Sequence, residues 1–164
     1  MGKVVLARVD VRLIHGQVMT GLSKSAGATA IFVADDHSSQ DTFTKNIILG
    51  AGSRTGLKVR VLKEEGAVRY WNDRQYDDFK VILLTKSVET MAEIIKGGVP
   101  IAELNLGGIP QKPGFTSIIK EVSINQEQLN LLKELNNDYG VNVYFQATPS
   151  SKKVSLKDAS LMFE

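Results

Sequence analysis

Four side chains near the amino terminus combine anion binding with acid–base chemistry: Arg8, Asp10, Arg12 and His15. Guanidinium groups are the donors best matched to phosphate oxygens, and a neutral imidazole serves as a general acid or base, or as a nucleophile. Either use needs one ring nitrogen aimed at the substrate and the other held, by Asp10 or by a backbone carbonyl. The pattern predicts a phosphate site and makes His15 a candidate for either role. Residue types alone do not decide this, because a loop histidine is more often simply solvated.

These residues follow a stretch, KVVLARV (3–9), whose β-branched and apolar side chains predict the first strand. Asp10 to His15 then occupy its carboxyl end and the following turn, and Gly16 and Gln17 open the first helix. Ligands of open α/β sheets bind at this edge. The first turn of a helix also presents unpaired N–H groups and a positive dipole end. We therefore predict that the backbone N–H groups of Gly16 and Gln17 contact the anion.

Two further candidate phosphate-binding residues, Gly107 and Gly108, end the later apolar run IAELNLGG (101–108). The sheet order can place their turn beside the His15 loop, where glycine lets the backbone approach an anion. A plain strand-ending turn explains the same two residues equally well. Other polar and aromatic residues have simpler interpretations as helix caps, solvated side chains or packing: Asp35, Asp36, His37, Tyr70, Trp71, Tyr76 and Lys112.

Short apolar runs alternate with segments of helical period along the chain. This βαβ pattern favours a mainly parallel sheet covered by helices. We predict an α/β fold, with one domain over residues 1–164, an open twisted sheet of about six or seven strands and helices on both faces. Residues 109–124 contain two prolines and are predicted to form a loop followed by a short edge strand, and 155–164 a short terminal helix. The other helical segments are 16–25, 40–53, 64–75, 87–97 and 125–138.

Composition excludes several classes of function. The chain has 164 residues and no cysteine, so disulfides and thiolate metal ligands are ruled out, and a reducing compartment fits. Lysine plus arginine number 20 against 18 acidic residues, and this +2 balance is too small to indicate nucleic-acid binding. No apolar run approaches the roughly 20 residues that span a bilayer, and no signal peptide is recognisable. We expect a cytoplasmic protein that is not transmembrane.

The stretch around His15 also resembles a motif of a known protein family. The stretch ARVDVRLIHGQV resembles the active-site motif of the IIB component of the mannose, fructose and sorbose family of the bacterial phosphoenolpyruvate-dependent sugar phosphotransferase system. That motif commonly reads Arg-hydrophobic-Asp-Asp-Arg-Leu-Ile-His-Gly-Gln. IFVADD, VILLTKS and GGVPIAELNLGG also resemble the family, so the likeness covers most of the chain. It departs at Val11, where the family often has a second aspartate, which leaves Asp10 as the functional carboxylate.

The resemblance implies a phosphohistidine–sugar phosphotransferase. His15 would accept a phosphoryl group on Nδ1 from a phosphohistidine of the IIA protein or domain, and donate it to a sugar held by the membrane IIC and IID components. Arg12 is the first choice for stabilising charge on the phosphoryl oxygens, and Arg8 is a further candidate. Asp10 would organise the loop or an arginine, and the transfer between histidines would need neither metal nor cofactor. The carrier must expose His15 to two partners in turn, which predicts a solvent-accessible edge.

Two other functions fit the same residues. A non-catalytic α/β module would sense a phosphorylated ligand or partner at the helix terminus, and a hydrolase using Asp10 would release inorganic phosphate. The intact DVRLIHGQV stretch favours the carrier, because a module that only binds an anion needs no nucleophile. The sequence does not specify the sugar, so mannose, fructose, sorbose and N-acetylgalactosamine stay open. It also leaves open whether the chain forms a homo-oligomer.

Overall fold

The computed structural model describes the backbone of residues 1–164 and every side chain except those of Gln17 and Val18. The strands of its main sheet are β1 (Lys3–Asp10), β2 (Ala30–Ala34), β3 (Lys58–Leu62), β4 (Lys80–Thr85), β5 (Glu103–Gly108), β8 (Asn142–Phe145) and β9 (Val154–Ser155). The helices are α1 (Gly16–Ala26), α2 (Asp36–Gln40), α3 (Thr42–Ser53), α4 (Glu64–Arg74), α5 (Val88–Lys96), α6 (Gln126–Tyr139) and α7 (Leu156–Leu161).

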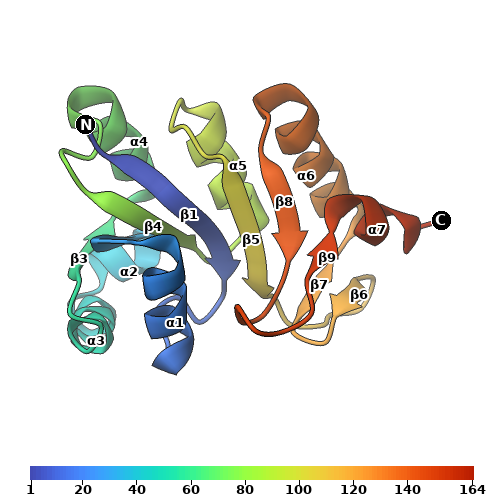
Figure 1. Cartoon of the computed structure of the whole chain (residues 1–164), viewed down its shortest axis with the longest axis horizontal. Helices are drawn as coiled ribbons and strands as arrows, with labels where there is room; N and C mark the ends of the chain where they lie inside the picture. The colour runs from blue at the N-terminus through green and yellow to red at the C-terminus, as the bar shows by residue number, and fades with distance from the viewer.

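The described backbone forms a seven-stranded sheet in the order β3-β2-β4-β1-β5-β8-β9 (Figure 1). Its strands pair in parallel, apart from β9, which is antiparallel to β8. The aliphatic strands β2 and β4 are buried almost throughout, as expected for central parallel strands with both faces covered. The predicted α/β fold with an open, mainly parallel sheet is confirmed, and so is the short terminal helix, here α7.

Helices cover both faces of the sheet, with a different extent on each. Side chains of α4, α5 and α6 pack with Ala7, Val9 and Leu104 on one face, and this face holds the larger apolar cluster. Side chains of α1 and α3 pack on the other face with Leu6 of β1 and residues of β2 and β4. On that second face no helix lies in front of β5 and β8 within the described chain (Figure 1).

Strand alternation assigns polar residues to this uncovered area. Because Ala7 and Val9 face the larger cluster, Arg8 and Asp10 point to the opposite side, and the same alternation holds for β5 and β8. We call this area the polar face, defined by the side chains of Arg8, Asp10, Glu103, Asn105, Tyr144 and Gln146.

Residues 109–124 differ from the prediction of a loop followed by an edge strand. They contain two strands, β6 (Thr116–Ile119) and β7 (Val122–Ile124), which form a separate antiparallel sheet. The chain reverses at Lys120 and Glu121, which lack the Asn-Gly or Gly-rich signal of a tight hairpin. Ile109 forms an isolated bridge to Val122, which ties this hairpin to the end of β5. The sequence prediction also missed α2 and β9, both very short.

Among the described residues, no helix combines the length and apolar character that crossing a bilayer requires.

Candidate functional site

The loop after β1 is held at both ends by backbone contacts and by buried apolar side chains. Asp10 pairs in register with Gly108 of β5, and the Val11 N–H donates to the Gly108 carbonyl over 2.9 Å. The Leu13 N–H returns to the Asp10 carbonyl over 2.9 Å, which closes a tight turn in which Leu13 adopts a φ of 57°. Leu13 is buried in the cluster beneath α1, and this packing stabilises the left-handed backbone conformation.

His15 ends this turn as the residue that precedes α1. Its backbone is extended and α1 begins at Gly16, as the sequence predicted. The His15 side chain therefore lies beside the first turn of an 11-residue helix, where N–H groups and the positive dipole end favour an anion. Gly16 is exposed. The side chain of Gln17 lies outside the described residues, and the phosphate contacts predicted for both backbone N–H groups stay a prediction.

Asp10 is the centre of the site. Its carboxylate is fully buried and accepts hydrogen bonds from three neighbouring residues. Arg12 donates from its backbone N (3.0 Å), Nε (2.9 Å) and Nη2 (2.9 Å), Arg8 donates from Nη2 (3.1 Å), and His15 Nε2 lies 3.0 Å from Oδ2. Burial by itself raises the pKa of Asp10, but the hydrogen bonds and charges of these neighbours outweigh it and hold the pKa below the usual value. Asp10 is thus an ionised acceptor.

The bond to Asp10 fixes the orientation of the His15 ring. An ionised carboxylate can only accept, so Nε2 carries the proton and Nδ1 keeps its lone pair. Among the described side chains, Nδ1 has no hydrogen-bond partner. The His15 side chain is 21% exposed, so the ring is supported from inside while part of it is open to solvent. This is the arrangement that a nucleophilic imidazole needs.

The two arginines of the motif have different positions. The Arg12 side chain is 49% exposed and uses Nε and Nη2 to bind Asp10, whose hydrogen bond raises the pKa of Arg12. Its third nitrogen, Nη1, has no hydrogen-bond partner in the part of the chain that the structure describes. Arg12 can therefore offer this nitrogen to an anion on His15 while it stays bound to Asp10.

Arg8 occupies the interior instead. Its side chain is 0% exposed, and its terminal nitrogens donate to the Asp10 carboxylate, the Asn105 amide oxygen (2.5 Å) and the Ala147 carbonyl (2.8 Å). Burial lowers the pKa of Arg8, and the charge of Asp10 partly offsets this effect. The structure corrects the expectation that this guanidinium faces a phosphate, because every strong contact it makes is directed into the protein. Arg8 supports Asp10 rather than the anion.

Gly107 and Gly108 lie beside the His15 loop, as the sequence allowed, and their absent side chains make room for the charged residues. A Cβ atom on Gly107 would lie 2.1 Å from Cζ of Arg8, and one on Gly108 would lie 2.6 Å from Oδ1 of Asp10. Close approach of the neighbouring side chains is thus a sufficient reason for glycine at both positions. Direct backbone contact with phosphate stays a prediction.

Sequence reasoning missed Asn105, Gln146 and Ala147. Asn105 is 1% exposed, binds Arg8 and donates to the Gln146 carbonyl over 2.9 Å. Its only signal in the sequence is a polar residue within the apolar run IAELNLGG. Gln146 and Ala147 contribute backbone carbonyls, which leave no signal in a sequence.

The remaining candidates have structural roles. Asp35 caps α2 through the Ser38 N–H (3.1 Å), and the Glu64 N–H donates to Asp36 (2.8 Å). The His37 side chain is 70% exposed, so its interpretation as a solvated histidine is confirmed. The aromatic cluster packs with Phe32 in the core: Tyr70, Trp71 and Tyr76. Lys112 lies over the ring of Phe115, 5.7 Å from its centroid.

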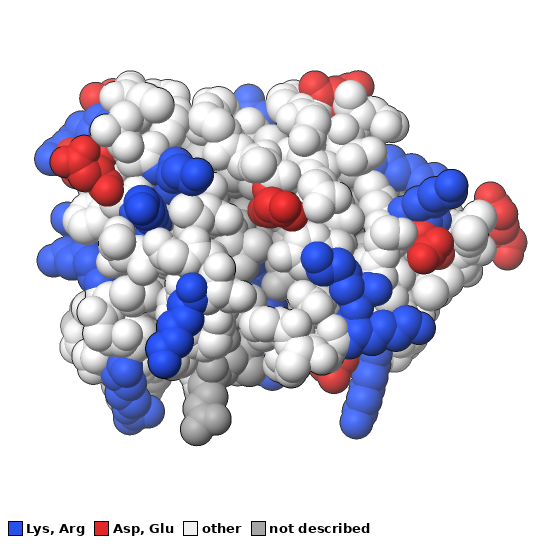
Figure 2. Space-filling view, viewed as in Figure 1, with Lys and Arg blue, Asp and Glu red and all other residues white. Residues whose placement is uncertain are grey.

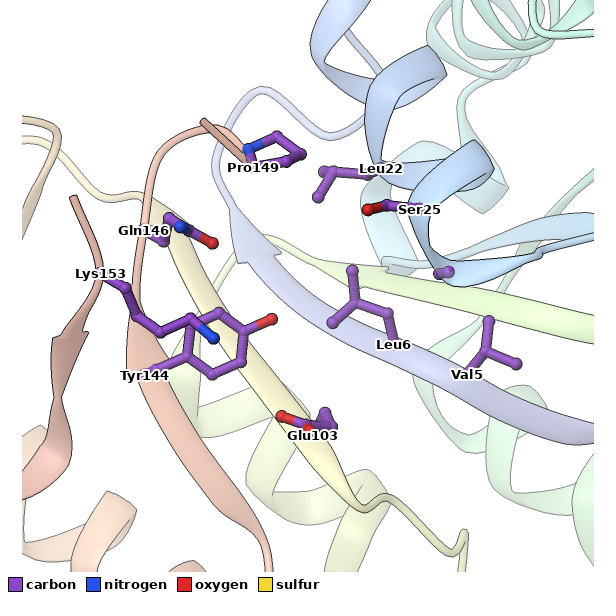
Figure 3. Close-up of a pocket in the computed structure, with 10 residues that line it drawn as sticks. Val5, Leu6, Leu22, Ser25, Glu103, Tyr144, Gln146, Pro149 and Lys153 are labelled. Atoms are coloured by element: carbon purple, nitrogen blue, oxygen red, sulfur yellow. The ribbon is translucent and has the colours of Figure 1, made fainter. Parts of the chain in front are cut away.

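A groove of about 340 Å³ lies further along the polar face, between α1 and the segment that follows β8 (Figure 3). Leu6 and Tyr144 form part of its lining, and Lys153 lies over the Tyr144 ring at 4.3 Å. Leu6 precedes Arg8 by two residues on β1, so the groove adjoins the Arg8 network. Figure 2, in the view of Figure 1, shows Lys and Arg side chains in both halves of this face, several of them in the lower half, where α1 lies.

Together, the fold and the site define an open α/β domain that presents a histidine, backed by a buried carboxylate, at the carboxyl edge of its sheet. Comparison with known proteins specifies this class. Residues 4–162 match the family described as the PTS system sorbose subfamily IIB component. The sorbose-specific EIIB component of Klebsiella pneumoniae is 33% identical over 156 residues, which cover 95% of this chain and 94% of that protein.

Two further relatives support the assignment. The crystal structure of manxB from Thermoanaerobacter tengcongensis has a TM-score of 0.91 and 38% identity, covering 98% of this chain and 96% of that one. The mannose-specific EIIAB component of Escherichia coli K12 is 29% identical over 93% of this chain, which corresponds to 47% of that protein. The chain belongs to the sorbose subfamily of phosphotransferase system IIB components and has a phosphotransferase role in sugar transport. The alternative of a non-catalytic module is not favoured.

Proposed function

We propose that His15 is the phosphorylated residue of this IIB component. It accepts a phosphoryl group on Nδ1 from a phosphohistidine of IIA and passes it to a sugar bound by the membrane IIC and IID components. The observation that carries the proposal is the position of Asp10, which binds Nε2 and leaves Nδ1 free. Partial exposure of the ring gives two partners access in turn.

The transfer step follows from this geometry. The Nδ1 lone pair attacks phosphorus while the bond from phosphorus to the donor's histidine nitrogen breaks, and the donor ring recovers its lone pair. The His15 ring gains positive charge in this step, and the Asp10 carboxylate beside the Nε2–H stabilises that charge. Transfer to the sugar reverses the process, with a sugar hydroxyl oxygen as the nucleophile and its proton lost to a base in the membrane partner or to water.

Arg12 stabilises the negative phosphoryl oxygens in this proposal. Its Nη1 donates to them, while its bonds to Asp10 hold the guanidinium beside His15. The N–H groups at the start of α1 add donors with the same preference for an anion. Phosphoryl transfer between histidines needs positioning and charge stabilisation, which these groups supply without a metal or a nucleotide.

The partners follow from the same reaction. A mannose-specific relative is described as an EIIAB component, so A and B components share one protein there. We propose that residues 1–164 act as one IIB domain in the cytoplasm, docking on IIA and at the inner face of the membrane. Basic side chains along the lower half of the view in Figure 2 favour partners with acidic surfaces.

The test is reconstitution with phosphoenolpyruvate, the general phosphotransferase proteins and a cognate IIA. Mass spectrometry should show a gain of one acid-labile phosphoryl group that disappears in His15→Ala. His37→Ala is the matched control and should be labelled like the wild type, because His37 is solvated. Equal labelling of His15→Ala would exclude the assignment. Steady release of inorganic phosphate without a trapped phosphoprotein would instead support a hydrolase that uses Asp10.

A further inference from the structure

We propose that Asn105 is a positioning residue for His15 and that it acts through Arg8 and Asp10. The inference rests on the phosphocarrier function proposed above and adds a residue of β5 to it. Asn105 contacts neither His15 nor the space beside Nδ1. Its effect on His15 passes through Arg8 and Asp10, two buried charged residues that link β5 to the His15 loop.

The first link joins Asn105 to Arg8. The Asn105 Oδ1 accepts from Arg8 Nη1 over 2.5 Å, while its Nδ2 donates to the Gln146 carbonyl over 2.9 Å. The bond to Arg8 is buried, so water cannot readily replace that partner, whereas the bond to Gln146 is partly buried. Arg8 Nη1 has one other acceptor among the described residues, the Gln146 carbonyl, at 3.5 Å. Asn105 therefore provides the main constraint on this end of the guanidinium.

The second link joins Arg8 to His15 through a single oxygen atom. Arg8 Nη2 donates to Oδ2 of Asp10, and the same Oδ2 holds His15 Nε2 at 3.0 Å. Arg12 Nη2 also donates to this Oδ2, over 2.9 Å, while Oδ1 is bound by Arg12 Nε and by the Arg12 backbone N–H. A rotation of the Arg8 guanidinium therefore removes the inner of the two arginine donors that position the acceptor for His15.

The segment after β8 gives this network a firm outer support. Arg8 Nη2 also donates to the Ala147 carbonyl, and the Gln146 side chain donates to the Ser151 carbonyl over 2.8 Å. Pro149 of this segment lies opposite Leu22 of α1 at one end of the groove (Figure 3). The carbonyls that hold Arg8 and Asn105 thus belong to a closed turn packed toward the helix that follows His15.

The chemistry of Asn105 fits orientation better than stability alone. A buried amide within an apolar strand costs free energy unless both its polar ends are bonded, and here Arg8 and Gln146 bond them. What the amide supplies is one acceptor for Arg8 and one donor for Gln146, at fixed positions. Without it, we expect Arg8 to lose its orientation and Asp10 Oδ2 to leave His15 Nε2. A neutral imidazole then distributes its proton over both nitrogens, and a protonated Nδ1 cannot attack phosphorus.

The primary test is the tautomer of unphosphorylated His15, measured by nitrogen NMR of protein labelled with ¹⁵N-histidine. The chain has two histidines, so exposed His37 serves as an internal reference. The wild type should show the Nε2–H form at His15. Asn105→Ala should show a mixture shifted toward the Nδ1–H form. An unchanged His15 spectrum in Asn105→Ala would overturn the proposal, whatever the change in stability.

The matched control is Asn142→Ala. Asn142 begins β8 and donates to Glu103 over 2.9 Å at an exposed position, so its loss removes an asparagine bond from the neighbouring strand. We expect no change in the His15 spectrum. If Asn105→Ala does not fold, Asn105→Ser repeats the deletion with a hydroxyl too short to reach Arg8. Asn105→Asp keeps the acceptor for Arg8 and should retain the Nε2–H form, and loss of that form would contradict the proposed link.

Phosphoryl transfer from phospho-IIA gives a second readout. Asn105→Ala should lower the transfer rate by about tenfold to a hundredfold, the range expected when a nucleophile is misplaced, with Asn142→Ala within about twofold of the wild type. If the wild type accepts no phosphoryl group, the proposed function fails. The NMR comparison still decides the role of Asn105 in that case, because it does not depend on transfer.

Discussion

The two sides of β1 are buried equally by different means. Ala7 and Val9 pack among apolar side chains of the larger cluster, whereas Arg8 and Asp10 on the polar face are equally inaccessible but charged and hydrogen-bonded. Apolar packing depends on volume and contact and tolerates small shifts, while a buried ion pair with fixed acceptors permits one arrangement. One side of the strand therefore mainly stabilises the fold. The other side carries the hydrogen-bond network that contacts Nε2 of His15.

The largest effect is expected when the network loses its inner cation. Arg8→Ala removes a cationic partner of the buried Asp10 carboxylate, and the four oxygen atoms that accept hydrogen bonds from Arg8 each lose a donor. The free energy of unfolding should therefore fall by about 3–5 kcal/mol. Leu104→Ala, on the opposite face, should cost about 2–5 kcal/mol. Urea denaturation measures the loss of unfolding free energy in both variants. Transfer by the folded fraction should fail in Arg8→Ala and persist in Leu104→Ala, and equal transfer in both would contradict the comparison.

A smaller effect is expected from adding one methyl group beneath the network. The Cβ atom of Gly107→Ala would lie 2.1 Å from Arg8 Cζ, so the guanidinium must shift, and we expect a loss of about 1–3 kcal/mol. Gly50→Ala is the control, because a Cβ on this α3 glycine meets nothing within 4 Å. Thermal and urea unfolding, together with the His15 spectrum, would test this. A Gly107→Ala protein with wild-type stability and tautomer would contradict it.

As the pH falls, the charged network on the polar face should lose its contribution to stability before the apolar packing on the opposite face does. The Asp10 pKa is lowered in the folded protein from an unfolded value of about 3.9, so the unfolded chain binds its proton first. The stabilisation is complete above the unfolded pKa and is lost as the pH falls through the folded pKa. Unfolding free energies measured from neutral to acid pH should fall more steeply for the wild type than for Asp10→Asn. If the unfolding free energies of the two proteins changed in parallel with pH, Asp10 would contribute nothing to the pH dependence of stability.

The smallest effect is expected at Val11, where the sequence departs from the family motif. The Val11 side chain is 41% exposed and lies outside the Asp10 network. Val11→Asp should change stability by less than about 0.5 kcal/mol and transfer by less than about twofold, because Asp10 already occupies the position beside His15 Nε2. Val11→Ala is the control for loss of the side chain. A large gain in transfer with Val11→Asp alone would give this position a role in catalysis.

Much of the fold was predictable because it depends on local patterns. Apolar runs and helical periods identified six strands of the main sheet, the longer helices and the terminal helix, since hydrophobic periodicity reflects which side of an element is buried. The hairpin β6–β7 was not predicted, because its turn carries no glycine or asparagine signal. The short elements α2 and β9 contain too few residues to show a period.

The site was predictable in its members but not in their arrangement. The motif and its place between strand and helix named His15, Arg12 and Asp10, because types and spacing along one loop are visible in a sequence. It ranked Arg12 before Arg8 for the phosphoryl oxygens but could not show which guanidinium is buried, since strand alternation and the pairing of β1 with β5 decide this. Asn105 and the carbonyls after β8 come from residues about 100 or more positions further along the chain.

The sequence by itself therefore determined the class of fold, the family and the candidate loop, because each is visible as a pattern along the chain. Only the tertiary structure decided that Asp10 holds Nε2 of His15, that Arg8 supports Asp10 from inside, and that Asn105 supports Arg8. The physical reason is that a hydrogen bond needs its donor and acceptor aligned within about 3 Å. For Arg8 and Asn105 that alignment exists only after β1 and β5, which are distant in sequence, have paired.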